Sequence, residues 1–497
     1  MEIVDSAENL VDSGNMITWR LCFSSFVASI GMIQFGWNTG VINNPQTSIK
    51  LFINETLVNR GSFVSDSKIK ILLATVVAIF AAGGLVGALI AGWLSNRFGR
   101  RNGILANTLV MFVSGVFMLF APYARSFEMI IIGRLLTGIG SGIYTGIVPV
   151  YLNEIAPLKV RGAFGIMSQL GVVIGIFLSE ILGLTAVMGN EKYWNILLGL
   201  IIIPAILQAL FLHFCPSSPK YLLFFKNDER AAEKALRKLR PLSFDIESEM
   251  EQMKKDSEHS RHIEKVGIRS MITNRHLLMS LTVGIVLHLS QQFSGINNIF
   301  YYSSTLFESV GVSKQNSEFS TLGVGGIMIL VTLISIPLIE RVGRRVLHIG
   351  GLCGCLLTCV CFTIFYSFHS QISSFNYLSV ISALLFVASF GIGPGSIPWM
   401  MIPEMFAEGS RSTAASVGVS VNWLSNLVVG LIFPSLHDAL QNLIFIPFIV
   451  CQVLSILFLW FKMPETKGLK ISETVGFLKD QEEGIISGGN LDKNSQF

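Results

Sequence analysis

Long apolar segments separated by short polar ones dominate the pattern of the chain. Each is long enough to supply the roughly 20 residues that an α-helix needs to cross a bilayer. The segments lie near residues 18–40, 70–95, 102–123, 127–149, 162–184, 194–214, 275–303, 318–339, 346–368, 376–402, 412–436 and 442–463. They are continuous rather than alternating, so they predict helices and not barrel strands. We therefore expect an all-α membrane protein with twelve transmembrane helices.

Charged turns repeat between the two halves of the chain. The segment 96–101 ends in Gly-Arg-Arg, and the segment 340–345 ends in the same three residues. A second pattern also occurs once in each half, as Glu154 with Arg161 and as Glu404 with Arg411. The spans are thus predicted to form two six-helix repeats, an architecture that places a substrate between the halves in many transporters.

The segment between the halves is rich in charge and cannot lie in the bilayer. Leu236 and Leu239 fall on one face of a charged stretch, which favours short amphipathic helices over a solvated linker. The predicted divisions are a cytoplasmic N-terminal tail (1–17), a six-helix bundle (18–214), a cytoplasmic helical connector (215–274), a second six-helix bundle (275–463) and a cytoplasmic C-terminal tail (464–497).

The positions of Arg and Lys in the short loops predict orientation. They cluster after even-numbered spans, so both termini and the connector are expected in the cytoplasm. The loop at 41–69 then faces outward, where Asn54-Glu55-Thr56 is a glycosylation sequon. We expect a multi-pass protein of the plasma membrane, glycosylated at Asn54.

Composition excludes several classes of protein. The chain is 51% hydrophobic and 14% charged, with a net charge of +4 that is spread over the turns, so the bilayer is an expected partner and nucleic acid is not. Cys353, Cys355, Cys359 and Cys361 lie in one span and are interpreted as packing residues. We predict no disulfide, no metal site, no cofactor and no enzymatic activity, because paired catalytic acids and nucleotide-binding loops are missing from the sequence.

Neutral amides inside the spans suit a sugar, because each hydroxyl both donates and accepts hydrogen bonds. The amides around 291–298 and in the eleventh span are the richest cluster. A single amide could instead serve as an interhelical hydrogen bond. Glycine and proline at 391–398 predict an interruption of the tenth span that could bend as a gate.

Several motifs resemble those of the sugar porter branch of the major facilitator superfamily, and specifically the facilitative glucose transporters. They are Gln34–Asn43, Gln291–Asn297, Gly393–Trp399, Asn422-Trp423 and Pro464–Gly468. The resemblance implies alternating access between two bundles. It also implies that the sugar contacts Gln169, Gln291, Gln292, Asn297, Trp399 and Asn422.

The charged turns are candidates for a cytoplasmic gate whose ion pairs form and break during transport. Its predicted members are Arg97, Arg100, Arg101, Glu154, Arg161, Glu340, Arg341, Arg344, Arg345, Glu404, Arg411 and Glu465. The related transporters usually carry an acid where Ser217 stands here and an arginine where Lys220 stands. We therefore expect the network of the first half to be weaker than that of the second, where Glu465 is retained.

Asn38 favours passive transport, because proton-coupled relatives carry an aspartate there, beside the arginine that matches Arg134. Glu180 and His288 keep proton coupling open as an alternative, because ionisable side chains inside spans are energetically costly and usually have a function. A sugar sensor without transport is a second alternative.

Three residues depart from the pattern of the glucose-selective relatives: His288, Met328 and Gly391. A facilitative hexose uniporter is predicted, with D-glucose as the favoured substrate. Galactose, mannose and fructose stay open as further substrates.

Overall fold

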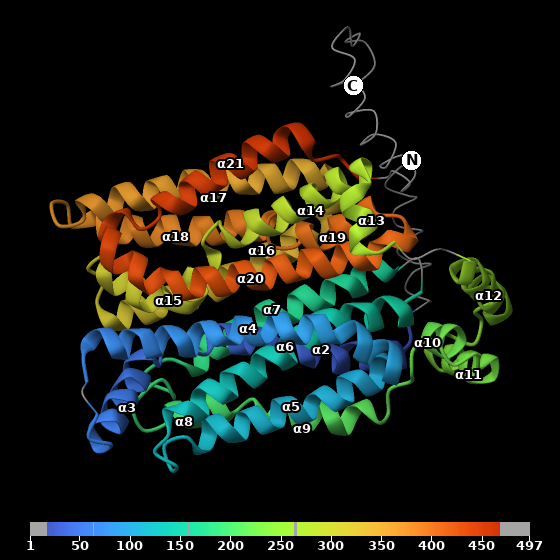
Figure 1. Cartoon of the computed structure of the whole chain (residues 1–497), viewed down its shortest axis with the longest axis horizontal. Coiled ribbons are helices and arrows are strands. Elements are labelled where there is room, and N and C mark those ends of the chain that lie inside the picture. The colour runs from blue at the N-terminus through green and yellow to red at the C-terminus, as the bar shows by residue number, and fades with distance from the viewer. Residues whose placement is uncertain (1–16, 63, 158–159, 263–265, 468–497) are drawn as a thin grey trace, which may run out of the picture.

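The structure is a computed structural model that describes residues 17–62, 64–157, 160–262 and 266–467. Within these ranges it is helical and contains no strand. Most helices run along the long axis of the molecule and form two bundles, one for each half of the chain (Figure 1). The all-helical fold predicted from the apolar segments is confirmed.

The first bundle contains α2 (Trp19–Gly40), α4 (Asp66–Phe98), α5 (Arg100–Phe120), α6 (Phe127–Ile155), α7 (Arg161–Leu182), α8 (Trp194–Gly199) and α9 (Ile202–Leu212). The second contains α14 (Arg275–Gln292), α15 (Ile296–Ser309), α16 (Lys314–Val342), α17 (Arg344–Phe368), α18 (Ser374–Ile392), α19 (Ile397–Met405), α20 (Glu408–Leu440), the 3₁₀ turn η2 (Gln441–Leu443) and α21 (Ile446–Lys462). All twelve predicted spans are therefore helical segments.

Ten helical segments of the described chain are long and apolar enough to cross a membrane. The first and last predicted spans are not among these ten. Helix α2 has 22 residues but carries Arg20, Gln34 and Asn38. Helix α21 is apolar but has only 17 residues, because it begins at Ile446 after the η2 turn.

Two spans of the second bundle are broken. Gly295 separates α14 from α15 and has a φ of 91°, a left-handed conformation that side chains other than glycine rarely adopt. Helices α18 and α19 are separated by 393–396. A Cβ atom at Gly393 would lie 2.1 Å from the Leu347 carbonyl oxygen, so glycine allows α17 to approach this break. The predicted interruption of the tenth span is confirmed.

The bundles meet along two helix pairs, α4 with α20 and α7 with α16. In the first pair Trp423 of α20 packs between Phe35 and Phe80, at ring-centroid distances of 5.6 and 5.8 Å. A Cβ atom at Gly84 would lie 2.2 Å from the Trp423 ring. A large aromatic side chain of one bundle therefore occupies a recess in the other.

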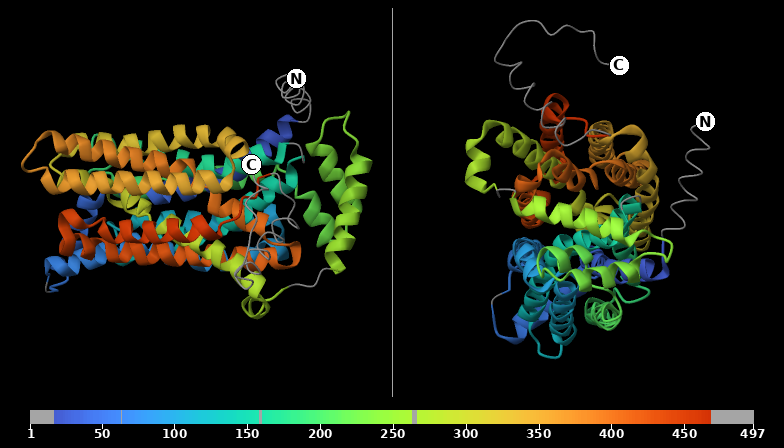
Figure 2. Two further views of the ribbon diagram at one scale, coloured as in Figure 1. Left: turned by 90° about the horizontal axis from the view of Figure 1, so that it is seen from above. Right: turned by 90° about the vertical axis from the view of Figure 1, so that its right-hand side faces the viewer.

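The connector lies at one end of the bundles, which we call the connector end (Figures 1 and 2). It contains α10 (Pro219–Phe224), α11 (Glu229–Leu239), α12 (Ile246–His262) and α13 (Ile268–Thr273). Leu236 and Leu239 are fully buried, as the amphipathic pattern predicted. Arg240 fixes the connector to the first bundle, since it pairs with Glu249 at 2.7 Å and donates to the Ile155 carbonyl at 2.7 Å.

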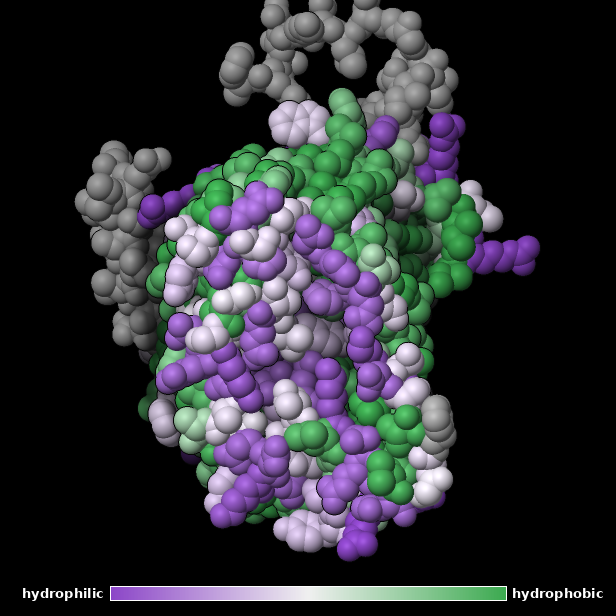
Figure 3. All heavy atoms as spheres, turned by 90° about the vertical axis from the view of Figure 1, so that its left-hand side faces the viewer, coloured by the Kyte–Doolittle hydropathy of each residue, from purple (hydrophilic) through white to green (hydrophobic). Residues whose placement is uncertain are grey.

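The opposite end carries α3 (Gln46–Asn59), and we call it the α3 end. Hydrophilic residues gather in the middle and lower part of this end face, with hydrophobic residues towards its upper and right-hand margins (Figure 3). Hydrogen bonds join the bundles here: Asn43 Nδ2 donates to Ser303 Oγ at 2.7 Å, and Lys70 pairs with Asp438 at 2.7 Å. The bundles are thus held together at the α3 end.

Candidate functional site

Four amide side chains form a buried hydrogen-bonded cluster between α14, α15 and α20. Gln292 Nε2 donates to Asn422 Oδ1 at 3.0 Å, and Asn422 Nδ2 donates to Gln291 Oε1 at 2.6 Å. Asn297 Nδ2 donates to Gln292 Oε1. All four residues are at most 7% exposed. The structure thus brings together four of the six residues that the resemblance assigned to the sugar.

Gln291 also connects the cluster to the break in the tenth span. Its Nε2 donates to the carbonyl oxygens of Pro394 and Gly395, at 2.8 Å each. The Pro394 carbonyl would normally accept from the backbone N–H four residues later, but that residue is Pro398, which has none. Gln291 supplies the missing donor. The amide cluster and the break between α18 and α19 are therefore joined by hydrogen bonds.

His288 bonds to the cluster, whereas the sequence identified it as an ionisable group within a span and as a departure from the pattern of relatives. Asn422 Nδ2 lies 3.1 Å from His288 Nδ1. The half-buried Trp399 ring packs edge-on against the imidazole, with 5.2 Å between centroids. A Cβ atom at Gly418 would lie 2.9 Å from the imidazole, so glycine there leaves room for it. The one-turn spacing between His288 and Gln292 in α14 was the signal that could have placed both on one side.

Gln169, Met328 and Gly391 do not take part in the hydrogen bonds described for the amide cluster. Gln169 is half-buried on α7, in the other bundle, and the hydrogen bonds described for the amide cluster do not include it. Gly391 and Met328 are neighbours: a Cβ atom at Gly391 would lie 2.9 Å from Val331 and 3.4 Å from the Met328 sulfur. The space beside Gly391 is therefore filled by apolar side chains of α16.

Arg134 is a fully buried cation of the first bundle. Its Nη1 donates to the Asn38 carbonyl at 2.7 Å, its Nε donates to the Val76 carbonyl at 3.2 Å, and its guanidinium lies 4.6 Å from the Phe80 ring centroid. Carbonyl dipoles and a ring face, rather than a carboxylate, are the partners that the structure describes for this charge.

The charged turns at the connector end form matching pairs within each bundle. Arg100 pairs with Glu154 at 2.8 Å, and Arg344 pairs with Glu404 at 3.3 Å. Each arginine begins a helix after a glycine with positive φ, 88° at Gly99 and 106° at Gly343. The repeated sequence thus builds the same local geometry twice.

A different group covers each of these helix starts. In the second bundle the Glu465 carboxylate accepts from the backbone N–H of Arg344 at 2.9 Å and of Arg345 at 3.0 Å. In the first bundle an aromatic ring stands there instead: a Cβ atom at Gly99 would lie 2.6 Å from Tyr221. The Arg100 guanidinium also lies over the Tyr221 ring, with its Cζ atom 5.4 Å from the ring centroid.

Glu465→Ala is expected to lower the free energy of unfolding by about 1–3 kcal/mol, because two helix-terminal N–H groups lose a charged acceptor. Thermal unfolding of the purified protein measures this change. Glu258→Ala, at an exposed site of the connector, is the control and is expected to leave stability unchanged. Equal stability of both variants would contradict the capping role.

Three of the remaining predicted gate residues donate to backbone carbonyls of their own bundle. Arg101 donates to the Leu212 carbonyl at 2.8 Å, Arg345 donates to the Trp460 carbonyl at 2.5 Å, and Arg411 donates to the Phe406 carbonyl at 3.2 Å. Arg97 and Arg341 are exposed. The Glu340 side chain lies outside what the structure describes.

Arg161 of the first-bundle gate is partly buried. Burial lowers the pKa of its guanidinium, and the nearby Glu249 carboxylate opposes that shift. Because Glu249 also pairs with Arg240, the connector brings an acid close to two arginines.

The sequon at Asn54 lies inside α3. Asn54 is half-buried, and the Thr56 hydroxyl is buried and donates to the Phe52 carbonyl at 2.8 Å. In the folded protein this geometry limits access to the acceptor, and glycosylation of Asn54 stays a prediction.

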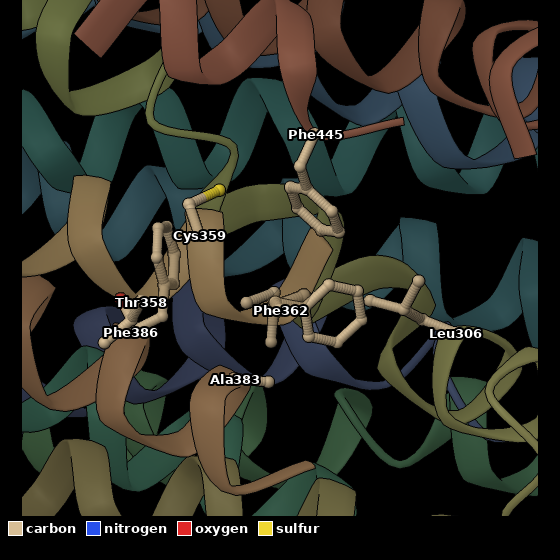
Figure 4. Close-up of a pocket in the computed structure, with 8 residues that line it drawn as sticks. Leu306, Thr358, Cys359, Phe362, Ala383, Phe386 and Phe445 are labelled. Atoms are coloured by element: carbon tan, nitrogen blue, oxygen red, sulfur yellow. The ribbon is translucent and has the colours of Figure 1, made fainter. Parts of the chain in front are cut away.

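A small cavity lies behind α15, away from the amide cluster. Its volume is about 10 Å³, and it is lined by Ile299, Leu306, Thr358, Cys359, Phe362, Ala383, Phe386 and Phe445 (Figure 4). About one water-sized sphere would fill it, so it cannot hold a sugar. The amide cluster is therefore the stronger candidate site.

Comparison with known proteins identifies the family. Residues 24–475 match the family model described as Sugar (and other) transporter. The chain belongs to the sugar transporter family. It is 42% identical over 480 residues to facilitated glucose transporter member 3 of solute carrier family 2 from Mus musculus, a match that covers 96% of this chain and 97% of the relative. It is 40% identical over 464 residues to member 1 from Gallus gallus, covering 93% and 94%.

Solved structures of the xylose transporter XylE share the fold of this family member. The proton:xylose symporter XylE bound to 6-bromo-6-deoxy-D-glucose gives a TM-score of 0.75 at 26% identity, over 92% of this chain and 99% of that chain. The inward-open form from E. coli gives a TM-score of 0.75 at 25% identity, over 91% and 98%. The predicted resemblance to sugar porters is confirmed.

Proposed function

We propose that this protein is a facilitative hexose transporter that works by alternating access between its two bundles, with D-glucose as the favoured substrate. The buried cluster of Gln291, Gln292, Asn297 and Asn422 is the observation that carries the proposal. It offers neutral donors and acceptors beside the indole of Trp399, and it lies between helices of a fold that the facilitative glucose transporters share.

Trp399 and Gln169 complete the proposed sugar site. Trp399 supplies an apolar wall for the C–H face of the ring, and Gln169 would approach from the first bundle when the two halves close on the sugar. His288 bonds Asn422 and packs on Trp399, so we include it as a specificity residue. Its imidazole differs in shape from the glutamine that glucose-selective relatives often carry, which favours a broad hexose range including galactose, mannose and fructose.

We place the protein in the plasma membrane, with both termini and the connector end in the cytoplasm. The arginines of the charged turns lie at the connector end, which agrees with the preference of basic residues for the cytoplasmic side. The twelve charged residues of the predicted gate are proposed to act there. The paired arginines and carboxylates within each bundle would rearrange when that side opens and closes.

The decisive experiment is flux of radiolabelled hexoses into proteoliposomes without ion gradients. We expect D-glucose to equilibrate across the membrane and not to accumulate, and a hexose panel would define the range. Accumulation driven by an imposed pH gradient would support the symporter alternative, which XylE exemplifies by name. Binding without flux would identify a sensor.

A further inference from the structure

Glu180 is a buried carboxyl group that the proposed function does not use. It lies on α7, is 1% exposed, and its Oε2 accepts from the backbone N–H of Gly325 on α16 at 3.1 Å. Helix α7 belongs to the first bundle and α16 to the second, and the two run side by side where the bundles meet (Figure 1). The bond therefore joins the two bodies that alternating access must move apart.

The contact requires glycine at position 325, because a side chain there has no room. A Cβ atom there would lie 2.2 Å from Glu180 Oε2 and 3.0 Å from Phe177 Cα, so any larger residue would collide with α7. Glycine thus brings the backbone of α16 within hydrogen-bond distance of the carboxyl group. The close approach depends on both residues.

A second carboxylate makes the reverse contact. Glu318 of α16 accepts from the backbone N–H of Thr185, just after α7, at 3.0 Å, and also from the Thr185 hydroxyl. Glu318 and Gly325 are seven residues apart, which is about two helical turns, so both lie on the face of α16 that meets the first bundle. Each bundle therefore contributes one acidic side chain and one backbone donor.

A polar network between these two contacts strengthens the same junction. Asn44 donates to the Glu180 carbonyl at 3.4 Å and accepts from the Ser304 hydroxyl at 2.5 Å. Ser304 in turn bonds Thr321 of α16 at 3.0 Å. Thr321 lies between Glu318 and Gly325 on the same face, so the junction is continuous from the α3 end inwards.

We propose that Glu180 and Glu318 form a two-point clasp that holds the α3 end of the molecule closed, and that both are positioning residues for alternating access. The inference rests on the proposed function, since the clasp matters only if α7 and α16 separate during transport. When they separate, both carboxylates exchange a backbone donor for water. Loss of either acceptor then favours the form that is open at the α3 end.

Pulsed electron paramagnetic resonance can measure this separation without sugar. Spin labels at Val187→Cys and Gln315→Cys, both exposed and on opposite sides of the clasp, would report the distance in nanodiscs in a background without the native cysteines. We expect a dominant short distance in the reference protein. Glu180→Ala and Glu318→Ala should each raise the population ratio of long to short distances about tenfold, the effect of losing one or two hydrogen bonds.

Matched variants separate the clasp from general damage to the fold. Glu180→Gln keeps an acceptor on a side chain of the same length and should restore the short distance. Glu191→Ala removes an exposed acid at the same end and should change nothing. Gly325→Ala disrupts the same contact from the α16 side, because its Cβ atom would collide with the Glu180 carboxyl group. It should favour the long spin-label distance as Glu180→Ala does.

The proposal is overturned if Glu180→Ala leaves the distances unchanged, or if Glu180→Gln opens the α3 end as much as alanine does. Sugar flux is measured separately. Reference protein that shows no flux but responds to these substitutions would refute the proposed function and leave the clasp standing. Sugar flux in the reference protein, together with spin-label distances that do not respond to the substitutions, would support the proposed function and refute the clasp.

Discussion

Gln291→Ala is expected to lower D-glucose uptake by about 10- to 100-fold. The glutamine makes three hydrogen bonds, two to the carbonyls of Pro394 and Gly395 and one from Asn422, and each neutral bond is worth about 1 kcal/mol. Its loss disorders the proposed sugar site and leaves the carbonyls of Pro394 and Gly395 without their donor. Initial rates of uptake in proteoliposomes measure the effect.

Gln371→Ala is the matched control, because Gln371 is exposed in the loop between α17 and α18. Its uptake should equal that of the unchanged protein. Thermal unfolding of both variants distinguishes a damaged site from a misfolded protein. If Gln291→Ala folds and its uptake stays within about twofold of the unchanged protein, the amide cluster is not the sugar site.

Asn38→Asp is expected to make uptake dependent on a proton gradient. Arg134 is buried with carbonyl and aromatic partners, and both Arg134 Nη2 and Asn38 Oδ1 are buried without a hydrogen-bond partner in the structure. An aspartate at 38 would place a titratable acid beside a buried cation, where exchange of a proton can alter the balance between conformations. An imposed gradient, acidic outside, should then stimulate uptake by about fivefold or more, the lower range of coupling energies between sites.

The unchanged protein is expected to show no such stimulation, and Asn38→Ser should behave like it, since serine is neutral. Uptake into proteoliposomes with and without the imposed gradient measures all three proteins. A gradient response in the unchanged protein would show that another group couples transport to protons. Its absence in Asn38→Asp would show that the environment of Arg134 does not control coupling.

Much of the fold was predictable because bilayer insertion is a local requirement. A helix that crosses hydrocarbon must be long and apolar whatever surrounds it, so the apolar segments marked the helices. Prolines and glycines at 391–398 marked the broken span for the same local reason. The start of α21 was harder to place, because Leu443, Ile444 and Phe445 just before it are also apolar.

The members of the candidate site were predictable as residue types, but their partners were not. Amides within spans are costly, so their clustering near 291–298 was visible in the sequence. The link from Gln291 to the carbonyls of Pro394 and Gly395 depends on how α14 packs against the break in the tenth span. The position of His288 beside Asn422 likewise depends on how α14 packs against α20.

The sequence by itself determined the helical membrane class, the duplicated halves, the family and the residue types of the proposed sugar site, because these follow from hydropathy and short motifs. Only the tertiary structure decided what covers the two repeated charged turns, a carboxylate at Arg344 and an aromatic ring at Arg100. It also decided the partner of the Glu180 carboxyl group, which is the backbone N–H of Gly325. Every residue except proline carries a backbone donor, so no sequence pattern marks which one a buried carboxyl group will reach.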